Sequence, residues 1–379
     1  MHRSVLFCLA FALVCCPGLL QGATIRVPAE QSTIQAAIEL AVDWDLVLVA
    51  PGTYDETVDF LGKAIIVRAE EGPVGTIIDG GEGASVVTFA NGETLGSVIE
   101  GFTITKGSGT PDPYGPTTFG GGIYCLEASP KIIGCVIAGN RAEVGGGIFC
   151  ESASPSIRRC RISNNDADFG GGIFCQLQAS PLIVNCVIDG NEAVDAGGGI
   201  GCHMWSDATI VHSTITGNRA SAETLGGAGL FVFFSEVSLT NAIVWGNRGP
   251  DRKQIRIGFY DMNSTLTVSH SVVQDGMDGV FVYAQSTLEW LCGNLNRPPI
   301  FVGGGDYRLT PFSPCIDAGT HAGVTEDFDG FPRPLGDGFD IGAHEFTLGG
   351  ICFLASALSI TRPPIVVPMI VIPAKAGIQ

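Results

Sequence analysis

One six-residue phrase recurs through the middle of the chain and constrains the fold more than any other feature. It consists of three glycines, an isoleucine, a variable residue and a cysteine, and successive copies begin 25 to 29 residues apart. The copies are 120–125 (GGGIYC), 145–150 (GGGIFC), 170–175 (GGGIFC) and 197–202 (GGGIGC), followed by a degenerate copy at 226–232 (GGAGLFV). A period of this length indicates a solenoid, in which similar structural units stack on one another.

Aligned copies also show which side chains face the interior. Small or apolar residues fill one column and branched apolar residues lie two positions later, an alternation typical of a strand with one buried face. The first column contains Phe102, Cys135, Cys160, Cys186, Ser213, Ala242 and Ser271. The second contains Ile104, Ile137, Ile162, Ile188, Ile215, Val244 and Val273. A third column lies three residues before the first, and this odd offset predicts a bend between two short strands. Its members are Ile99, Ile132, Ile157, Ile183, Ile210, Leu239 and Val268.

With the Gly-rich phrase as a third strand, each repeat contains three short strands. Each strand is expected to pair with its copy about 4.8 Å away, so the fold class is all-β, a right-handed parallel β-helix. One rung is not stable alone, because ordering its backbone costs more than its few inward side chains contribute. Stability must therefore come from stacking between rungs.

The two ends of the chain depart from the repeat. Residues 1–22 combine a basic start with an apolar run and small residues, which is the pattern of a secretory signal peptide. Ser32 to Gln35 resembles a capping box that opens an amphipathic helix through Val42, and this helix is expected to cap the first rung. The predicted domain order is the signal peptide (1–22), the β-helix domain (23–346, with regular rungs at about 97–276 and a C-terminal cap at 285–346) and a disordered tail (347–379).

Charge and the signal peptide restrict the partners. The formal net charge of −18 disfavours phosphate backbones, so nucleic acid is not an expected partner. The signal peptide predicts a protein that is secreted, extracellular or on the cell surface, and the mature chain has no predicted membrane span.

The cysteines of the repeat are interpreted as core residues. In-register neighbours point the same way, so a disulfide between them would be strained, and small thiols suit a narrow interior. Cys292 and Cys315 lie outside these columns and are the expected disulfide pair.

Several segments resemble a known family. The Gly-rich rungs, the opening STIQAAIELA with VAPGTY, and the C-terminal SPCIDAG, DFDGFPRP and DIGAHEF resemble bacterial right-handed β-helix repeat proteins of the pectin-lyase-like fold. The C-terminal part is similar to choice-of-anchor Q domains. The resemblance implies the fold, but it implies little about activity, and no sorting motif for covalent attachment to a cell wall is found in the sequence. The catalytic signatures of pectin methylesterases and polygalacturonases are not found in the sequence.

An acidic column is the first candidate site. Glu143, Asp168 and Asp195 each occupy the turn before a Gly-rich phrase, so their carboxylates should stack roughly 5 Å apart. Such a stack either raises a pKa or binds a cation, and Ca²⁺ suits oxygen ligands. Two of these carboxylates could also serve as the acid and base of a glycosidase. The alternative is a solvated edge whose charges are offset by neighbouring arginines.

An aromatic column is the second candidate site. Tyr124, Phe149 and Phe174 alternate with the inward residues of the Gly-rich strand and should point outward, with Trp205 nearby. An exposed aromatic row offers a platform for sugar rings. The alternative is that the rings only stabilise the outer face of the sheet or lie under a loop.

Three functions remain open from the sequence. The first is a non-catalytic protein that binds a polysaccharide or recognises a cell-surface glycan, without a required cofactor. The second is a polysaccharide lyase or glycoside hydrolase that uses the stacked carboxylates, with Ca²⁺ as its ion. The third is a structural spacer.

Overall fold

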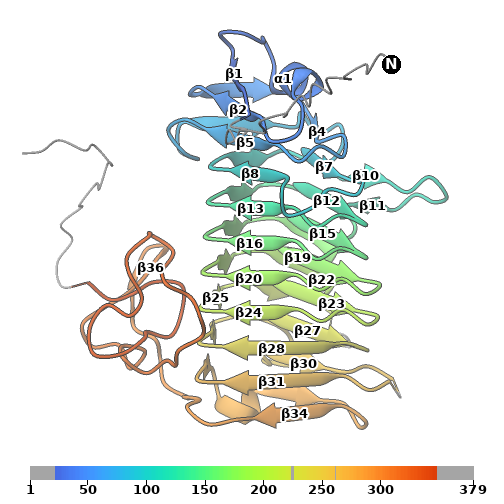
Figure 1. Cartoon of the computed structure of the whole chain (residues 1–379). Coiled ribbons are helices and arrows are strands. Elements are labelled where there is room, and N and C mark those ends of the chain that lie inside the picture. The colour runs from blue at the N-terminus through green and yellow to red at the C-terminus, as the bar shows by residue number, and fades with distance from the viewer. Residues whose placement is uncertain (1–21, 223–225, 261, 348–379) are drawn as a thin grey trace, which may run out of the picture. The chain divides into compact units, whose positions relative to one another are not determined.

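Short parallel strands make up most of the described chain, and each pairs with its counterpart one repeat away (Figure 1). The computed structural model describes residues 22–222, 226–260 and 262–347. Almost all of the predicted signal peptide and tail therefore lies outside the described residues. Within the described part, no helix is long and apolar enough to cross a membrane.

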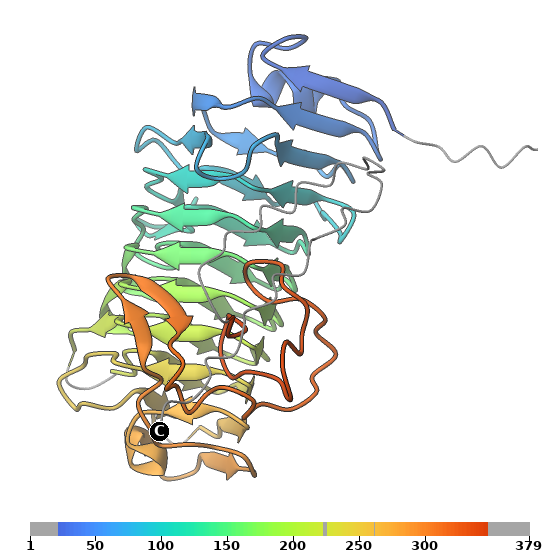
Figure 2. The ribbon, with the colours of Figure 1, turned by 90° about the vertical axis from the view of Figure 1, so that its left-hand side faces the viewer.

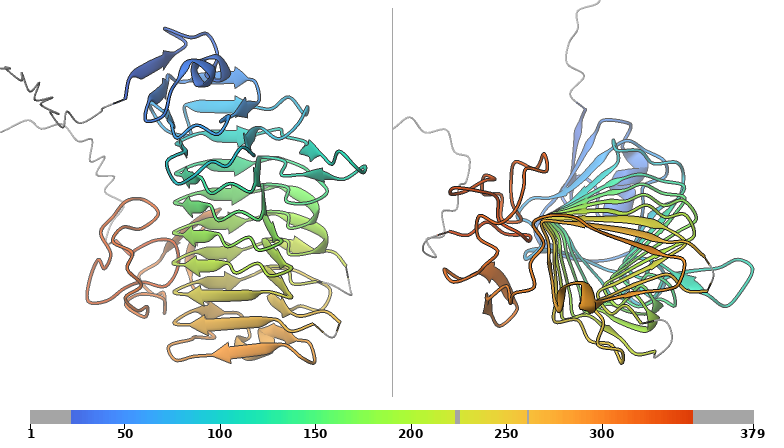
Figure 3. Two further views of the ribbon diagram at one scale, coloured as in Figure 1. Left: turned by 45° about the vertical axis from the view of Figure 1, so that its right-hand side comes forward. Right: turned by 90° about the horizontal axis from the view of Figure 1, so that it is seen from below.

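Three parallel sheets form the sides of a right-handed β-helix, as the repeat predicts (Figure 3). Sheet A contains β1 (Thr24–Val27), β2 (Leu46–Val49), β5 (Ile66–Ala69), β8 (Val98–Glu100), β13 (Lys131–Ile133), β16 (Ser156–Arg158), β20 (Leu182–Val184), β24 (Thr209–Val211), β28 (Glu236–Thr240), β31 (Thr265–Ser269) and β34 (Thr287–Trp290). Sheet B contains β3 (Gly52–Asp55), β6 (Thr76–Asp79), β9 (Thr103–Thr105), β14 (Val136–Ala138), β17 (Arg161–Ser163), β21 (Val187–Asp189), β25 (Thr214–Thr216), β29 (Ile243–Trp245) and β32 (Val272–Val273). Sheet C contains β4 (Val58–Asp59), β7 (Val87–Phe89), β12 (Ile123–Leu126), β15 (Ile148–Glu151), β19 (Ile173–Gln176), β23 (Ile200–His203), β27 (Leu230–Phe233), β30 (Ile255–Ile257) and β33 (Val280–Val282).

Smaller elements lie between and beyond these sheets. Sheet D contains β18 (Asp166–Phe169), β22 (Glu192–Ala196) and β26 (Arg219–Ala220), in the segment that leads into sheet C. Two antiparallel pairs are β10 (Thr110–Pro111) with β11 (Thr118–Phe119), and β35 (Phe301–Gly303) with β36 (Asp306–Leu309). A 3₁₀ helix, η1 (Gly276–Gly279), precedes β33.

The predicted inward columns form the core of the coil. Ile162 pairs in register with Ile137 on one side and Ile188 on the other, and all three are fully buried. Cys175 lies between Cys150 and Cys202 in the same way. The stacked cysteines are free thiols, which confirms the interpretation of these columns as core; they are Cys125, Cys135, Cys150, Cys160, Cys175, Cys186 and Cys202. The predicted Cys292–Cys315 disulfide is wrong, because Cys292 is exposed, Cys315 is buried and both are free.

A ladder of buried asparagines runs along one corner of the coil. The Asn140 amide nitrogen donates to Asn165 Oδ1 at 3.0 Å, and Asn165 donates to Asn191 at 2.9 Å. The ladder continues through Asn218 and Asn247. Each amide also donates to a backbone carbonyl, so the ladder satisfies polar groups that the narrow interior would otherwise leave unpaired.

The N-terminal helix is shorter than predicted. Helix α1 (Ile34–Leu40) begins after Thr33, whose hydroxyl accepts a hydrogen bond from Ala36 N at 3.1 Å. Ser32 is therefore not the cap, and Glu56 instead accepts hydrogen bonds from Ile34 N and Gln35 N. The buried face of the helix joins the core of the first rung.

Residues 296–346, called here the C-terminal lobe, pack against the side of the coil (Figures 1 and 2). Leu309, Cys315 and Ile341 share an apolar cluster with Ile243 and Val272 of sheet B. The lobe also donates hydrogen bonds from Ala343 N to Thr214 Oγ1 at 3.1 Å and from the Tyr307 hydroxyl to Asp189 Oδ2 at 3.1 Å. The segment expected to form a cap thus covers part of the outer face of sheet B.

Candidate functional site

Two columns of side chains lie on the outside of sheet C. The sheet contributes Tyr124, Phe149, Phe174, Gly201 and Phe231, paired in register. The residues that precede the Gly-rich turns form a second column of Phe119, Val144, Phe169, Ala196 and Gly226, linked by β-bridges or β-pairing. Two ring contacts join the columns, Phe119 to Phe149 at 4.8 Å and Phe169 to Phe174 at 6.2 Å between ring centroids. The second column therefore covers the first.

Glycine at the turn makes this covering possible. Gly145 and Gly170 adopt positive φ angles of 69° and 66°, which reverse the chain between the two columns. A Cβ on Gly170 would lie 2.5 Å from Phe174 Cβ, so no larger residue fits there without a shift.

The expectation of an exposed aromatic row on sheet C is wrong. Phe149 is 0% exposed and Phe174 is 5% exposed. Phe119 covers Phe149 from one side, and Tyr124 stacks on it at 5.6 Å. The β10–β11 hairpin supplies Phe119, so the alternative of rings lying under a loop describes this part of the face.

A pocket opens at the rungs where both columns contain small side chains. The sheet column narrows at Gly201 and the covering column at Ala196 and Gly226. The resulting aromatic pocket has a volume of about 400 Å³. It is lined by Val144, Phe169, Phe174, Gln176, His203, Phe231, Phe233, Phe259 and Tyr260. Phe174 leans toward the gap, because a Cβ added at Gly201 would lie only 2.7 Å from its ring.

The polar groups of the aromatic pocket are few and uncharged. Burial lowers the pKa of His203, so its imidazole is neutral at pH 7. The ring of His203 stacks on Phe233 at 5.0 Å. Gln176 Nε2 donates to Glu151 Oε2 at 2.6 Å. The pocket thus offers aromatic faces and little hydrogen bonding.

The acidic column lies on the same chain segments as the covering column. Glu143, Asp168 and Asp195 immediately precede Val144, Phe169 and Ala196 of the covering column. Burial, followed by the charges of Asp195 and Glu143, raises the pKa of Asp168.

The carboxylates of the acidic column do not form a close ligand set in the described part of the chain, and their role as a metal site stays a prediction. The Glu143 carboxylate accepts hydrogen bonds from the amide and hydroxyl of Thr118, the latter at 2.8 Å. In the described ranges, the only set of three ligand atoms within 4.8 Å of one another belongs to Asp327, Asp329 and His344. The three carboxylates therefore form a charged edge, but their oxygens do not form one of these close ligand sets, as a Ca²⁺ ion would need.

Trp205 lies at a different place from the other predicted aromatic residues. It occupies the turn between β23 of sheet C and β24 of sheet A, with a φ of 60°, and its side chain is 53% exposed. Phe234, at the same turn of the next rung, contacts it at 4.8 Å between ring centroids. Ser152, Gln178 and Phe234 have positive φ angles at the same turn of other rungs, so this conformation belongs to the corner of the coil.

Two adjoining hollows extend from Trp205 across sheet A, with volumes of about 320 and 410 Å³. Both are lined by Asp207, Glu236 and Thr265. The residues of the second hollow include a register column of Thr209, Ser238, Thr267 and Glu289. We call the two hollows the Trp205 groove. It combines an exposed indole with carboxylate and hydroxyl oxygens repeated at strand spacing.

Comparison with known proteins agrees with this architecture. Residues 76–241 match the family model described as a right handed beta helix region. No curated protein sequence gives a significant match. The right-handed β-helix region thus contains Trp205 and most of the residues around both hollows.

Several solved structures are similar to the chain at low identity. Pectate lyase Pel9A is 14% identical, with 86% of this chain and 96% of that chain covered and a TM-score of 0.46. A pectin methylesterase from Aspergillus niger is 13% identical over 73% of this chain and 83% of that chain, with a TM-score of 0.36. The pectin methylesterase PemA from Erwinia chrysanthemi is 12% identical over 76% and 92% of the two chains, with a TM-score of 0.34.

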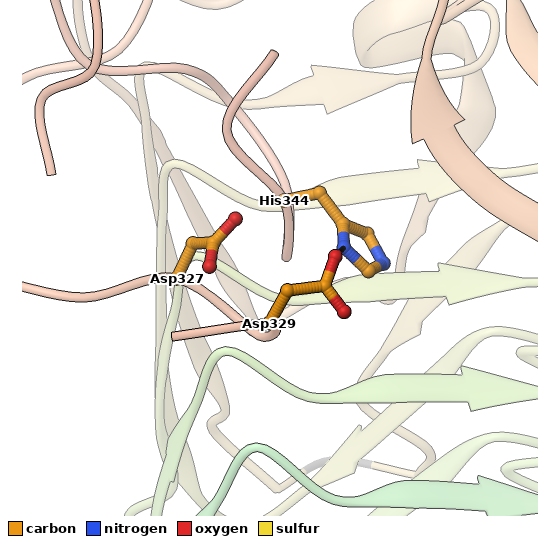
Figure 4. Close-up of side chains that lie close together, drawn as sticks. All are labelled: Asp327, Asp329 and His344. Carbon is orange, nitrogen blue, oxygen red and sulfur yellow. Dashed lines mark hydrogen bonds and ion pairs between the residues drawn. The ribbon is translucent and has the colours of Figure 1, made fainter. Parts of the chain in front are cut away.

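The trio in the C-terminal lobe was not identified from the sequence as a ligand set (Figure 4). His344 Nδ1 lies 3.1 Å from Asp329 Oδ2, and this contact lowers the pKa of Asp329. Asp327 is fully buried, and its two oxygens accept hydrogen bonds from Phe331 N and Glu345 N. These contacts hold two chain segments together, so a structural role accounts for the trio without an ion.

Sequence reasoning missed both the aromatic pocket and the Trp205 groove. The signal for the aromatic pocket is the change from GGGIFC to GGGIGC at Gly201, together with the loss of the preceding Phe at Ala196. Phe259 and Tyr260 complete the pocket from an irregular segment after β30, and no repeat predicts their place.

Proposed function

We propose that the protein binds a polysaccharide along the Trp205 groove and does not cleave it. The observation that carries this proposal is a half-exposed indole, in tilted contact with Phe234, at the head of a groove lined by carboxylates and hydroxyls. An aromatic face contacts the apolar face of a sugar ring, and the surrounding oxygens accept or donate hydrogen bonds to its hydroxyls. The signal-like residues 1–22 support binding outside the cell.

The shape of the groove suits a chain molecule. Thr209, Ser238 and Thr267 repeat one polar position over successive rungs about 4.8 Å apart. A polymer with regularly spaced hydroxyls can therefore make the same contact several times.

The carboxylates of the groove have local structural partners. Asp207 Oδ1 accepts a hydrogen bond from Glu236 N at 3.2 Å, and Glu289 accepts one from the Thr267 hydroxyl at 2.8 Å. These contacts fix the positions of two carboxylates of the groove.

The test is retention of the full chain on a panel of immobilised neutral polysaccharides. Trp205→Ala should weaken binding to a retained polysaccharide about tenfold, because the stacking surface is lost. Trp44→Ala is the matched control, since Trp44 is 67% exposed and does not line the groove. Equal weakening by both variants, or no retention at all, would contradict the proposal.

Product analysis tests the non-catalytic part. Incubation of the retained polysaccharide with the protein should release no shorter fragments. Release that Glu236→Gln abolishes would replace the binding function with that of a polysaccharide-cleaving enzyme.

A further inference from the structure

We propose that the aromatic pocket on sheet C binds an organic ammonium cation, a primary or quaternary amine attached to an apolar body. This site is separate from the Trp205 groove, which lies on sheet A, and it goes beyond the polysaccharide binding proposed above. The two observations that carry it are the aromatic walls and the carboxylates that directly precede two of the wall residues in the chain.

The walls of the pocket present ring faces in several directions. Phe233 stacks near Phe231, with centroids 6.3 Å apart, and meets Phe259 at an interplanar angle of 71°. Tyr260 packs on Phe259 at 4.0 Å. Ring faces carry a negative quadrupole and attract a cation within about 6 Å, and the attraction is strongest where water is excluded. Rings that meet at an angle can contact one ammonium group from several sides.

The chain segments that supply two of the wall residues also carry formal negative charge. Phe169 and Val144 line the pocket, and their chain neighbours Asp168 and Glu143 belong to the acidic column. Asp195 continues that column in the next rung. Mutual repulsion of these carboxylates would be relieved by a bound cation.

Nearby protein cations already have other partners. Arg141 pairs with Asp166 at 3.4 Å, and its charge also opposes the rise in the pKa of Asp168. Arg256 pairs with Asp251 at 3.6 Å, and its guanidinium lies over the Phe281 ring at 4.2 Å.

None of the residues that line the pocket supplies a competing positive charge. Burial keeps His203 neutral at pH 7, and the remaining lining residues are uncharged types. The environment is therefore complementary to a positively charged apolar ligand and repels an anionic one.

The experiment compares three probes of one size and different charge with the full chain: 2-phenylethylammonium, 2-phenylethanol and phenylacetate. Calorimetric titration at pH 7 should rank the affinities in that order, with the ammonium about tenfold above the alcohol. Added sodium chloride should weaken the binding of the ammonium probe only. Equal affinity for the ammonium and the alcohol would overturn the proposal and would leave an apolar pocket without charge selection.

Variants separate the two contributions. Gly201→Phe continues the aromatic column through the gap and should abolish binding of all three probes. Asp168→Asn should lower only the ammonium affinity, by about threefold to tenfold. Glu71→Gln, at an exposed carboxylate that lines neither site, is the matched acidic control and should leave the three affinities unchanged. Unchanged ammonium binding in Gly201→Phe would place the binding elsewhere and overturn the proposal.

A second pocket variant covers the case in which Gly201→Phe does not fold. Phe259→Ala removes one wall outside the regular strands and should weaken binding of the ammonium probe more than binding of the alcohol. Trp205→Ala should leave amine binding intact, so failure of this proposal and failure of polysaccharide binding give different results. Amine binding that Trp205→Ala abolishes would refute the separate site.

Discussion

The coil and the C-terminal lobe are stabilised in opposite ways. In the coil, each interior position is shared with the rungs above and below, and apolar side chains and amides dominate. The lobe contains few repeated contacts and depends on buried charge. Arg333 pairs with Glu345 at 2.5 Å with both side chains fully buried. The comparison teaches that a repeat distributes stability over many equivalent positions, whereas a single-copy segment concentrates it in a few.

The largest expected effect is at the buried ion pair of the lobe. Arg333→Met leaves Glu345 charged and unpaired, which should destabilise the lobe by about 3–5 kcal/mol. Denaturant unfolding should then show an early transition, with proteolysis confined to residues 296–346. The double variant with Glu345→Met removes the unpaired charge and should recover part of the loss. A single transition at the wild-type midpoint would show that the pair contributes little.

The next effect is in the asparagine ladder of the coil. Asn191→Ala leaves the Asn165 side-chain amide without its acceptor and removes the Asn191 Nδ2 donor from Asn218 Oδ1, at a cost of about 1–3 kcal/mol. Because the contact belongs to a repeated column, the whole coil should unfold at lower denaturant in one transition. Asn164→Gly is the control, because Asn164 is exposed and glycine accommodates its positive φ of 54°. Separate unfolding of the rungs on either side of the variant would contradict the shared stabilisation.

The junction between the two regions should respond to acid through His212. Its ring contacts the Asp340 carbonyl in the lobe at 3.2 Å, and burial, with a smaller effect of Arg333, lowers its pKa to about 3. The unfolded histidine has a pKa of about 6.5, so only the unfolded state binds this proton between those values. The stability that His212 contributes is therefore present above about pH 6.5 and is lost as the pH falls toward 3.

The effect of His212 on the pH dependence of stability must be separated from that of Asp340, which has the opposite sign. Comparison of wild type with a His212 variant achieves this separation. Burial raises the pKa of Asp340 to about 6, so its protonation stabilises the fold as the pH falls below that value. Between pH 7 and 5, the stability difference between wild type and His212→Asn should change by on the order of 1–2 kcal/mol in favour of the variant. Parallel pH profiles for the two proteins would exclude this role.

The smallest expected effect is at the Asp327, Asp329 and His344 trio. Asp329 is partly exposed, so His344→Phe should cost less than about 1 kcal/mol. Dialysis against a chelator, followed by addition of Zn²⁺ or Ca²⁺, should leave the melting temperature unchanged. A metal-dependent rise that His344→Phe removes would show that the trio binds an ion.

The repeat determined how much could be predicted. Ile137, Ile162 and Ile188 share a register column as expected, because a fixed period places equivalent residues over one another. The exposure of Phe149 was mispredicted, because Phe119 covers it from a hairpin outside the period. Cys315 was misassigned for a related reason, since its burial depends on the packing of the lobe against sheet B. Contacts outside the repeat have no sequence signal of this kind.

The asparagine ladder has a consequence for how such a chain changes length. Each amide gives one hydrogen bond to the following rung and takes one from the preceding rung. If an in-frame genetic deletion removed one whole repeat, the asparagine Nδ2 donor of the rung before it would meet the asparagine Oδ1 acceptor of the rung after it. Rungs can thus be lost or duplicated without redesign of their neighbours, while the distance between surface sites changes in fixed steps.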